Sequence, residues 1–290
     1  MVKTSFKYCF YMLIIGAACF VSACRIDLFG LFGSTDLSKR LDEKNNFAFL
    51  GRYNGLPLDW GDTYSFILLS DTHIENGDAW GLEKLRDLVD NHNGDISNID
   101  NKIKFVVITG DITQNASEKD FKKFIEIADS LLPFGVSCYP VIGNHDVFFG
   151  NWSNWRDFIG STLYRINSDE GKTTLLIMDS ANAYFGKEQL DWLENQLKSS
   201  GKNTFVFTHA NPFVESPVEL QQFTDTTERA RFISLLHGRC DYAFTGHVHQ
   251  RVVKEVGGVT FVTVEDFRGK QVYCLISVKP GGITYDFKKL

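Results

Sequence analysis

Short apolar runs alternate with amphipathic segments from Tyr64 to about residue 245. The apolar runs are rich in Val, Ile, Leu and Phe, which is typical of strands covered on both faces. The segments between them place apolar residues at helical spacing, as with Phe121, Phe124 and Ala128. We therefore expect strands at 64–70, 104–109, 136–142, 172–179, 203–208 and 241–245, and helices at 80–92, 117–132, 152–160, 187–199 and 226–238.

The carboxyl-terminal part of the chain shows no clear helical periodicity. Its apolar runs at 251–258, 259–266, 271–280 and 282–287 are separated by glycine turns and predict strands. Alternating strands and helices followed by a strand-rich end indicate an α/β fold. Two sheets would pack face to face, with helices on the outside.

The amino terminus has the pattern of a secretory signal. Two lysines precede an apolar run from about Tyr8 to Val21, and small residues lead to Cys24. The run is shorter than the about 20 residues that a spanning helix needs. The tetrad Val21-Ser22-Ala23-Cys24 resembles the lipobox of bacterial lipoproteins, which implies that Cys24 is lipidated and becomes the first residue. Simple cleavage after Ala23 and an uncleaved anchor are the alternatives.

This interpretation divides the chain into three parts. Residues 1–23 would be the signal peptide, 24–60 a charged tether, and 61–290 a folded domain. The domain would then lie outside the cytoplasm, in the periplasm or on the cell surface, held to the membrane by its lipid. Arg25 follows the cysteine where an acidic retention signal would stand, which favours the outer membrane.

Composition limits the partners of this domain. The 290 residues carry a formal charge of −6 without basic blocks, so we expect no nucleic-acid-binding patch. A small anionic substrate is compatible with this charge if bound metal supplies the positive charge. Outside the signal and Cys24 the cysteine count is odd, so it gives no disulfide framework, although a Cys240–Cys274 bridge is left open.

Polar side chains gather where the expected strands end, and the carboxyl ends of parallel strands meet at one crevice. Five of the seven histidines of the chain are among them. The motifs are SDTH with Asp71 and His73, TGDIT with Asp111, GNHD with Asn144, His145 and Asp146, THANP with His209, and TGHVH with His247 and His249.

These donors indicate a metal site. Imidazole, carboxylate and amide oxygen suit divalent Zn, Mn and Fe. Glycines at 110, 143 and 246 precede key residues and would let the chain turn close to an ion. Two Asp, one Asn and four His exceed the needs of one tetrahedral ion. They suit two ions that share a bridging carboxylate, typically about 3.5–4 Å apart.

The ordered set "DTH … GD … GNHD … H … GHVH" resembles the calcineurin-like metallophosphoesterase superfamily over about residues 64 to 250. The resemblance implies a four-layer αββα sandwich. It also implies a hydrolase that acts on a small phosphoester substrate with two divalent metal ions (Mn, Fe or Zn). A metal-bridging hydroxide would attack phosphorus.

The resemblance also implies a role for each matching residue. One metal would be held by Asp71, His73 and His249, and the other by Asn144, His209 and His247. Asp111 would bridge the two ions, and we assign it a catalytic role together with His145. His145 would lie outside the coordination shell, facing the leaving oxygen. For Asp146, orienting His145 and orienting a neighbouring backbone group both remain open.

Within this superfamily we expect a phosphodiesterase. Close relatives that act on phosphodiesters often show HHPP at the fourth motif, where this chain has Thr208-His209-Ala210-Asn211-Pro212, which leaves the ligand in place. A broad-specificity phosphomonoesterase is the alternative enzyme. A catalytically idle metal-binding surface module is the alternative from another class.

An aromatic cluster follows GNHD. The rings of Phe148, Phe149, Trp152, Trp155 and Phe158 could line the pocket and stack on a planar leaving group, or pack a short helix. We favour packing of the short helix, since most aromatic side chains in proteins are buried in the hydrophobic core.

Overall fold

The computed structural model describes residues 36–213, 223 and 225–290. The expected signal peptide, the lipidation position Cys24 and the first part of the tether therefore lie outside the described residues. In the described part of the chain, no helix has the length and apolar character needed to cross a membrane.

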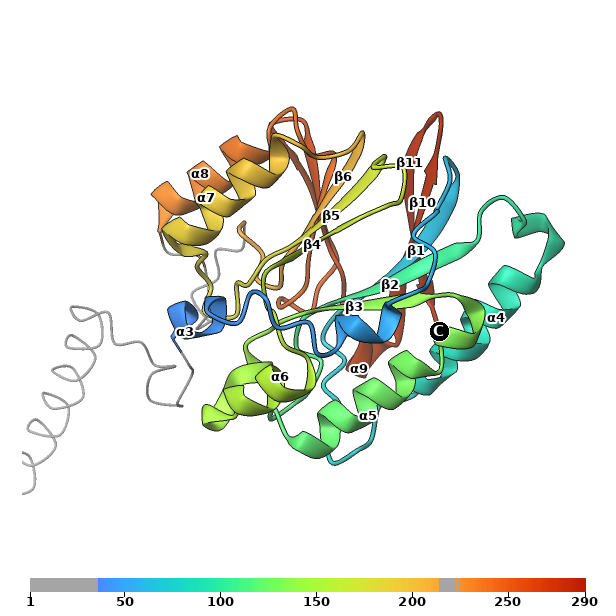
Figure 1. The fold of residues 1–290 in the computed structure, drawn as a ribbon, viewed down its shortest axis with the longest axis horizontal. Coiled ribbons are helices and arrows are strands. Elements are labelled where there is room, and N and C mark those ends of the chain that lie inside the picture. Colours follow the sequence, from blue (N-terminus) through green and yellow to red (C-terminus); the bar gives the residue numbers. More distant parts are fainter. Residues whose placement is uncertain (1–35, 214–222, 224) are drawn as a thin grey trace, which may run out of the picture.

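Two β-sheets form the centre of the molecule (Figure 1). The first has five strands in the order β11-β10-β1-β2-β3. β1, β2 and β3 are parallel, and β10 is antiparallel to both β1 and β11. The strands are β1 (Tyr64–Leu69), β2 (Ile103–Thr109), β3 (Ser137–Val141), β10 (Val272–Lys279) and β11 (Gly282–Lys289).

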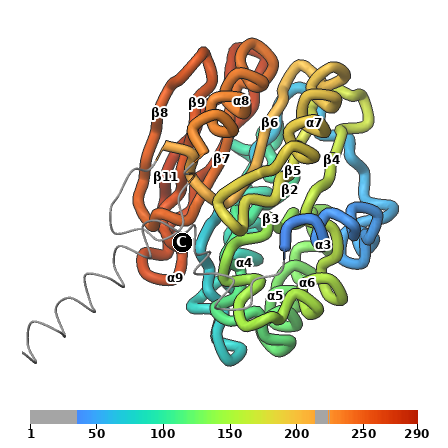
Figure 2. Tube along the Cα trace, turned by 90° about the vertical axis from the view of Figure 1, so that its left-hand side faces the viewer, coloured from blue at the N-terminus to red at the C-terminus, as the bar shows by residue number. Residues whose placement is uncertain are grey.

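The second sheet has six strands in the order β4-β5-β6-β7-β9-β8, parallel from β5 to β9 with an antiparallel strand at each edge. Figure 2 shows the edge strands β8 and β11 on one side of the molecule and β4 on the other. The strands are β4 (Tyr164–Asn167), β5 (Thr173–Ile177), β6 (Asn203–Phe207), β7 (Tyr242–Thr245), β8 (Val252–Val256) and β9 (Val259–Thr263).

Helices cover the outer face of each sheet (Figure 1). α4 (Leu85–Gly94) and α5 (Glu118–Asp129) lie beside the five-stranded sheet, and α7 (Gly186–Leu197) and α8 (Thr226–Leu236) beside the other. The expected αββα sandwich is thereby confirmed. The shorter helices are α3 (Leu37–Leu41), α6 (Trp152–Phe158), α9 (Phe267–Lys270), and the 3₁₀ turns η1 (Leu50–Tyr53), η2 (Leu82–Lys84), η3 (Ile96–Asn98), η4 (Leu132–Phe134) and η5 (His145–Gly150).

Aromatic rings fill the space between the sheets. The Phe66 ring of β1 lies 6.2 Å from that of Phe207 in β6 and 5.8 Å from that of Phe244 in β7, measured between centroids. All three side chains are buried. Burying one such ring contributes about 1.5–3 kcal/mol, so this layer fixes the two sheets against each other.

Residues 36–60 differ from the tether that we expected. Leu37, Leu41, Phe49, Tyr53 and Trp60 are all buried in the two hydrophobic cores. The apolar positions are scattered among charged residues, so the segment has the composition of a solvated linker although one face of it is packed. Within the described residues, the packed part of the chain therefore includes 37–60 as well as the segment from Gly61 onward.

Two other short elements were missing from the sequence prediction. β4 and α9 have four residues each, too few to show a period. The three cysteines 138, 240 and 274 are buried free thiols, so Cys240 and Cys274 do not form a bridge.

Candidate metal centre

Strand register places the first two motifs side by side. In the parallel pair β1–β2, Leu69 lies opposite Ile108. Beyond this pair, the Asp71 N–H donates to the Gly110 carbonyl (3.1 Å) and the His73 N–H donates to the Asp111 carbonyl (2.9 Å). The two carboxylate-bearing loops therefore leave the sheet together.

The motifs of the second sheet approach from the opposite side. The Gly246 N–H donates to the His209 carbonyl (2.9 Å), which joins the loops after β6 and β7. His209 Nδ1 lies 2.8 Å from the Thr109 carbonyl, and the His247 N–H donates to Asp71 Oδ2 (3.0 Å). These contacts between the sheets bring the strand-end residues of both into one cluster.

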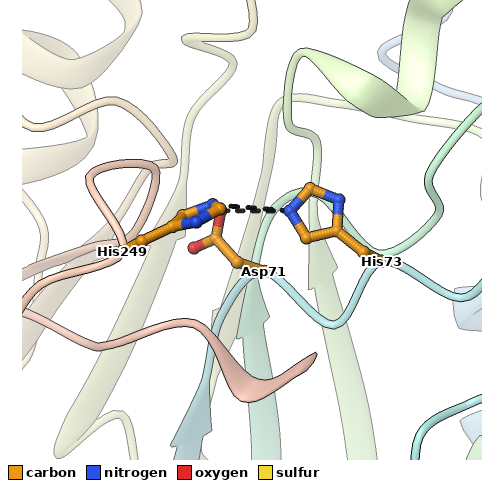
Figure 3. A group of neighbouring side chains, drawn as sticks. All are labelled: Asp71, His73 and His249. Atoms are coloured by element: carbon orange, nitrogen blue, oxygen red, sulfur yellow. Dashed lines mark hydrogen bonds and ion pairs between the residues drawn. The ribbon is translucent and has the colours of Figure 1, made fainter. Parts of the chain in front are cut away.

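Asp71, His73 and His249 form the first group of possible metal ligands (Figure 3). His249 Nε2 lies 3.1 Å from Asp71 Oδ1 and 3.4 Å from His73 Nε2. Asp71 Oδ2 accepts hydrogen bonds from the Ser70 hydroxyl and the His247 N–H, so Oδ1 is the oxygen that faces the two imidazoles. One carboxylate oxygen and two ring nitrogens thus converge on one point.

Asp111, His209 and His247 form the second group. His209 Nε2 lies 3.4 Å from Asp111 Oδ2, 3.2 Å from His247 Nδ1 and 3.0 Å from Asn144 Oδ1. The amide oxygen of Asn144 therefore joins the same cluster. All seven residues that the sequence indicated as ligands lie in these two groups.

Asp111 lies between the groups. Its Oδ1 accepts a hydrogen bond from the His145 N–H (2.8 Å). Its Oδ2 is 3.4 Å from His209 Nε2 and 3.9 Å from His73 Nε2, so it faces one imidazole of each group. A carboxylate in this position can serve both groups.

His145 lies at the more open side of the cluster. Its Nδ1 donates to the Gln114 carbonyl (2.8 Å), and its Nε2 is 4.0 Å from Asp111 Oδ2. Its side chain is 23% exposed, against 1% for His209. Together with His73 and Asp111, His145 also forms a third possible ligand group.

Five of the seven ligand candidates have left-handed backbone. The φ angles are 53° at Asp71, 43° at His73, 49° at Asp111, 71° at His247 and 53° at His249. This region is uncommon for residues other than glycine and costs of order 1–3 kcal/mol at each position. Such strain concentrates at functional sites, which supports a functional rather than a structural cluster.

The glycines at 143 and 246 allow neighbouring motifs to touch. A Cβ on Gly143 would lie 2.2 Å from both N and Oδ1 of Asp111, and a Cβ on Gly246 would lie 1.7 Å from Ser70 Oγ. Neither distance is compatible with a side chain. Both glycines are therefore required by close packing of the motif loops. Of the three glycines that we expected to allow sharp turns, only Gly110 has a positive φ, at 92°.

Buried charges shift the pKa values of the cluster. Burial alone would raise the pKa of Asp111, but electrostatic interaction with the neighbouring His209 and His145 rings holds it well below its usual value. Burial alone would lower the pKa of His209, but the Asp111 carboxylate raises it to about 9. For His73, burial outweighs the attraction of the Asp111 and Asp71 carboxylates, and the pKa is lowered.

Asp146 supports the loops after β2 and β3. Its buried carboxylate accepts hydrogen bonds from the N–H groups of Ile112 (3.2 Å), Thr113 (2.9 Å) and Gly143 (2.9 Å). Burial and the nearby Asp111 charge raise the pKa of Asp146 to about 7. Of the two roles left open by the sequence, the contacts favour orientation of neighbouring backbone.

Ser180 supports the loop of His209, and sequence analysis gave no sign of it. Its buried Oγ accepts hydrogen bonds from the N–H groups of His209 (3.1 Å) and Ala210 (2.8 Å). The Thr208 hydroxyl lies 2.6 Å from the same oxygen. A lone serine after a strand is too common to be recognised without coordinates.

The aromatic cluster after GNHD divides into two parts. Trp152 and Trp155 are buried and pack α6, as we favoured. The Phe148 ring instead contacts the His145 ring, with centroids 4.2 Å apart and ring planes tilted by 41°, and Phe149 is 62% exposed. The packing interpretation is thus wrong for these first two rings.

The donor set fits divalent cations. Nitrogen and oxygen donors without thiolate suit Zn, Mn or Fe. The buried carboxylates of Asp71 and Asp111 are costly to desolvate unless positive charge lies beside them. Protonated imidazoles provide that charge here, and a bound cation can replace them because ligands bind metal in the deprotonated form.

An αββα sandwich here carries Asp, Asn and His side chains at the carboxyl ends of its parallel strands. The family model described as calcineurin-like phosphoesterase matches residues 64–251, and the chain belongs to this family. The family typically depends on divalent metals, and the two ligand groups agree with this.

A relative with a named activity is similar to this chain in sequence. Over 207 residues the chain is 28% identical to a protein named as a probable glycerophosphodiester phosphodiesterase from Arcobacter nitrofigilis, covering 63% of this chain and 71% of the relative.

Solved structures show the same fold. A purple acid phosphatase from yellow lupin superposes with a TM-score of 0.59 at 13% identity, over 80% of this chain and 52% of that one. GAP50 of Plasmodium, described as the anchor in the inner membrane complex, superposes with a TM-score of 0.57 at 13% identity, over 79% and 85%.

Proposed function

We propose that this chain is a binuclear-metal phosphodiesterase. The observation that carries the proposal is the position of Asp111 Oδ2, within 4 Å of His209 Nε2 and of His73 Nε2, one from each ligand group. Asp71, His73 and His249 would hold one ion, and Asn144, His209 and His247 the other. Asp111 would be shared.

The residues of both groups would hold two divalent ions, and such ions would supply positive charge for phosphoryl oxygens and the activation of a water for attack on phosphorus. The chain itself contributes position and proton control. Asp111 Oδ1 is tied to the His145 N–H, which leaves Oδ2 facing inward. Orientation of this kind removes much of the entropic part of a reaction barrier.

His145 has the geometry of a proton donor to the leaving oxygen. Its Nδ1–H is fixed on the Gln114 carbonyl, so a proton on Nε2 is the one available to substrate. Its partial exposure allows substrate contact, which the buried His209 does not offer. A positioned acid of this kind accelerates a reaction by about 10²–10⁴-fold.

Preference for diesters rests on the relative from Arcobacter nitrofigilis, which is named for glycerophosphodiesters. The experiment compares turnover of bis-p-nitrophenyl phosphate and p-nitrophenyl phosphate by the purified protein with measured metal content. Faster turnover of the diester supports the proposal. Faster turnover of the monoester indicates a phosphomonoesterase, and full metal content without turnover of either indicates a binding module.

We also propose that the domain is tethered outside the cytoplasm by lipid on Cys24. The proposal rests on the amino-terminal sequence. Labelling with a radioactive or clickable fatty acid tests it. Label on the wild-type chain that is lost in Cys24→Ser supports the anchor, and equal labelling of both contradicts it.

A further inference from the structure

The amino-terminal helix α3 is joined to the domain by a buried ion pair. Arg40 Nε lies 2.7 Å from Asp179 Oδ2, and one terminal nitrogen of Arg40 donates to Asp179 Oδ1 (2.9 Å) and Asn182 Oδ1 (2.7 Å). Both charged side chains are 0% exposed. Leu37 and Leu41 of the same helix are buried beside α7 and α8 in the second hydrophobic core.

Asp179 belongs to the segment that leaves β5 toward the metal centre. Its backbone N–H donates to Gln189 Oε1 (2.9 Å), and its carbonyl accepts from Gln189 Nε2 (2.7 Å). Its Oδ1 also accepts from the Ala181 N–H (3.1 Å). Arg40 therefore fixes the Asp179 carboxylate, which also binds the Ala181 N–H. Ser180 lies between these two residues and is held from both sides.

Ser180 connects this segment to a candidate metal ligand. Its Oγ accepts hydrogen bonds from the N–H groups of His209 and Ala210 and from the Thr208 hydroxyl. His209 in turn directs Nε2 at Asp111 Oδ2 and Asn144 Oδ1. A continuous set of buried contacts thus runs from α3 to the second ligand group.

Anchoring alone does not require this arrangement. α3 has five residues, too few to be stable by itself, and its two leucines already provide apolar docking. A buried ion pair often contributes no more stability than apolar residues of similar volume. What the Arg40–Asp179 pair adds is a fixed orientation, given by two parallel hydrogen bonds to one carboxylate.

We propose that Arg40, Asp179 and Ser180 are positioning residues for His209, so that α3 is part of the support of the metal centre. The family match covers residues 64–251, so Asp179 and Ser180 lie within it, whereas Arg40 and the rest of α3 lie outside it. The contacts reach His209 and not the Asp71–His73–His249 group. Loss of these contacts should therefore weaken the binding of one of the two metal ions and leave the binding of the other unchanged.

The test is titration of the metal-depleted, full-length protein with Co²⁺, followed by its d–d absorption. Two variants interrupt the contacts at different points. Arg40→Met removes the ion pair, and Ser180→Ala removes the acceptor of the His209 and Ala210 N–H groups. We expect each to weaken one cobalt-binding step by about 10–100-fold, the usual effect of losing an outer-shell contact, and to leave the other within about twofold.

Two further variants separate positioning from stability. Arg40→Lys keeps the charge without the planar fork and should restore the weakened step in part. Leu85→Ala, in buried packing of α4 on the opposite outer face, should lower thermal stability without changing either cobalt step. Ser180→Ala leaves the ion pair intact, so it decides the question if Arg40→Met does not fold.

Unchanged cobalt affinities in Ser180→Ala would overturn the proposal and leave Arg40 a stabilising residue only. The proposal would also be overturned if the Arg40 and Ser180 variants weakened both cobalt-binding steps equally, and if Leu85→Ala did the same at an equal loss of thermal stability. The readout is metal affinity, so the result does not depend on which phosphoester the enzyme hydrolyses.

Discussion

His209 Nε2 lies 3.4 Å from Asp111 Oδ2, and neither side chain is more than 2% exposed. The two groups shift each other's pKa in opposite directions, upward to about 9 for His209 and well below the ordinary value for Asp111. An ionised carboxylate beside a protonated imidazole is a charge arrangement that a divalent cation can replace. Metal binding and proton release are therefore coupled in this cluster.

The first prediction concerns pH. With a pKa of about 9, the metal-free His209 is protonated at neutral pH, and a metal ion must displace that proton. Apparent metal affinity should therefore rise as pH increases from about 6.5 toward 9 and level off above. Calorimetric titration in buffers of different ionisation enthalpy measures the released protons. A pH-independent affinity with no proton release at pH 7 would contradict the assignment of His209 as a ligand.

The second prediction concerns Asp111→Asn. The amide keeps the volume but removes the charge that faces both ligand groups. We expect activity to fall by at least about 10³-fold, the size expected when both activation and positioning of a metal-dependent reaction are lost. Metal content, measured by atomic emission, should fall below that of the wild type. Substantial turnover by a metal-free Asp111→Asn sample would refute the mechanism, and circular dichroism controls for the fold.

The third prediction concerns His145→Ala. If His145 donates a proton to the leaving oxygen, this variant keeps its metals but loses about 10²–10⁴-fold in rate. The loss should be smaller for bis-p-nitrophenyl phosphate than for an alkyl diester, because p-nitrophenolate leaves readily without a proton. Equal losses for both substrates would exclude this role.

The fourth prediction concerns Gly143→Ala. The added Cβ would meet Asp111 N and Oδ1 at 2.2 Å, so the two motif loops must separate. We expect a loss of about 1–3 kcal/mol in the free energy of unfolding, typical of overpacking, together with weaker metal binding. Gly281→Ala is the matched control, since its Cβ meets no atom within 4 Å and its φ, like that of Gly143, lies outside the left-handed region. Similar metal affinities in both variants would show that the close approach at Gly143 is unimportant to the site.

The sequence allowed much of the fold to be predicted because long apolar strands and amphipathic helices have clear periods. β2 was expected at 104–109 and spans Ile103–Thr109, and α5 was expected at 117–132 and spans Glu118–Asp129. The cluster of polar residues could also be anticipated, since every one follows a strand. Short elements such as β4 and α9 have no period, and they were missed.

The residues that support the site were beyond sequence reasoning for a different reason. Ser180 and Arg40 act through contacts between segments distant in the chain, 29 residues apart for Ser180 and His209 and 139 for Arg40 and Asp179. Single serines and arginines carry no pattern by themselves. The left-handed backbone at Asp71 and Asp111 could not be predicted either, because an aspartate in the sequence does not indicate whether its φ is positive or negative.

The ligand candidates come from both sheets, and this has a mechanical consequence. Asp71 and His73 follow β1 of one sheet, whereas His247 and His249 follow β7 of the other. An ion held by Asp71 and His249 would act as a cross-link that resists sliding of one layer over its neighbour. Depletion by a chelator should then loosen the whole sandwich, so that protease resistance of the folded chain reports how much metal it carries.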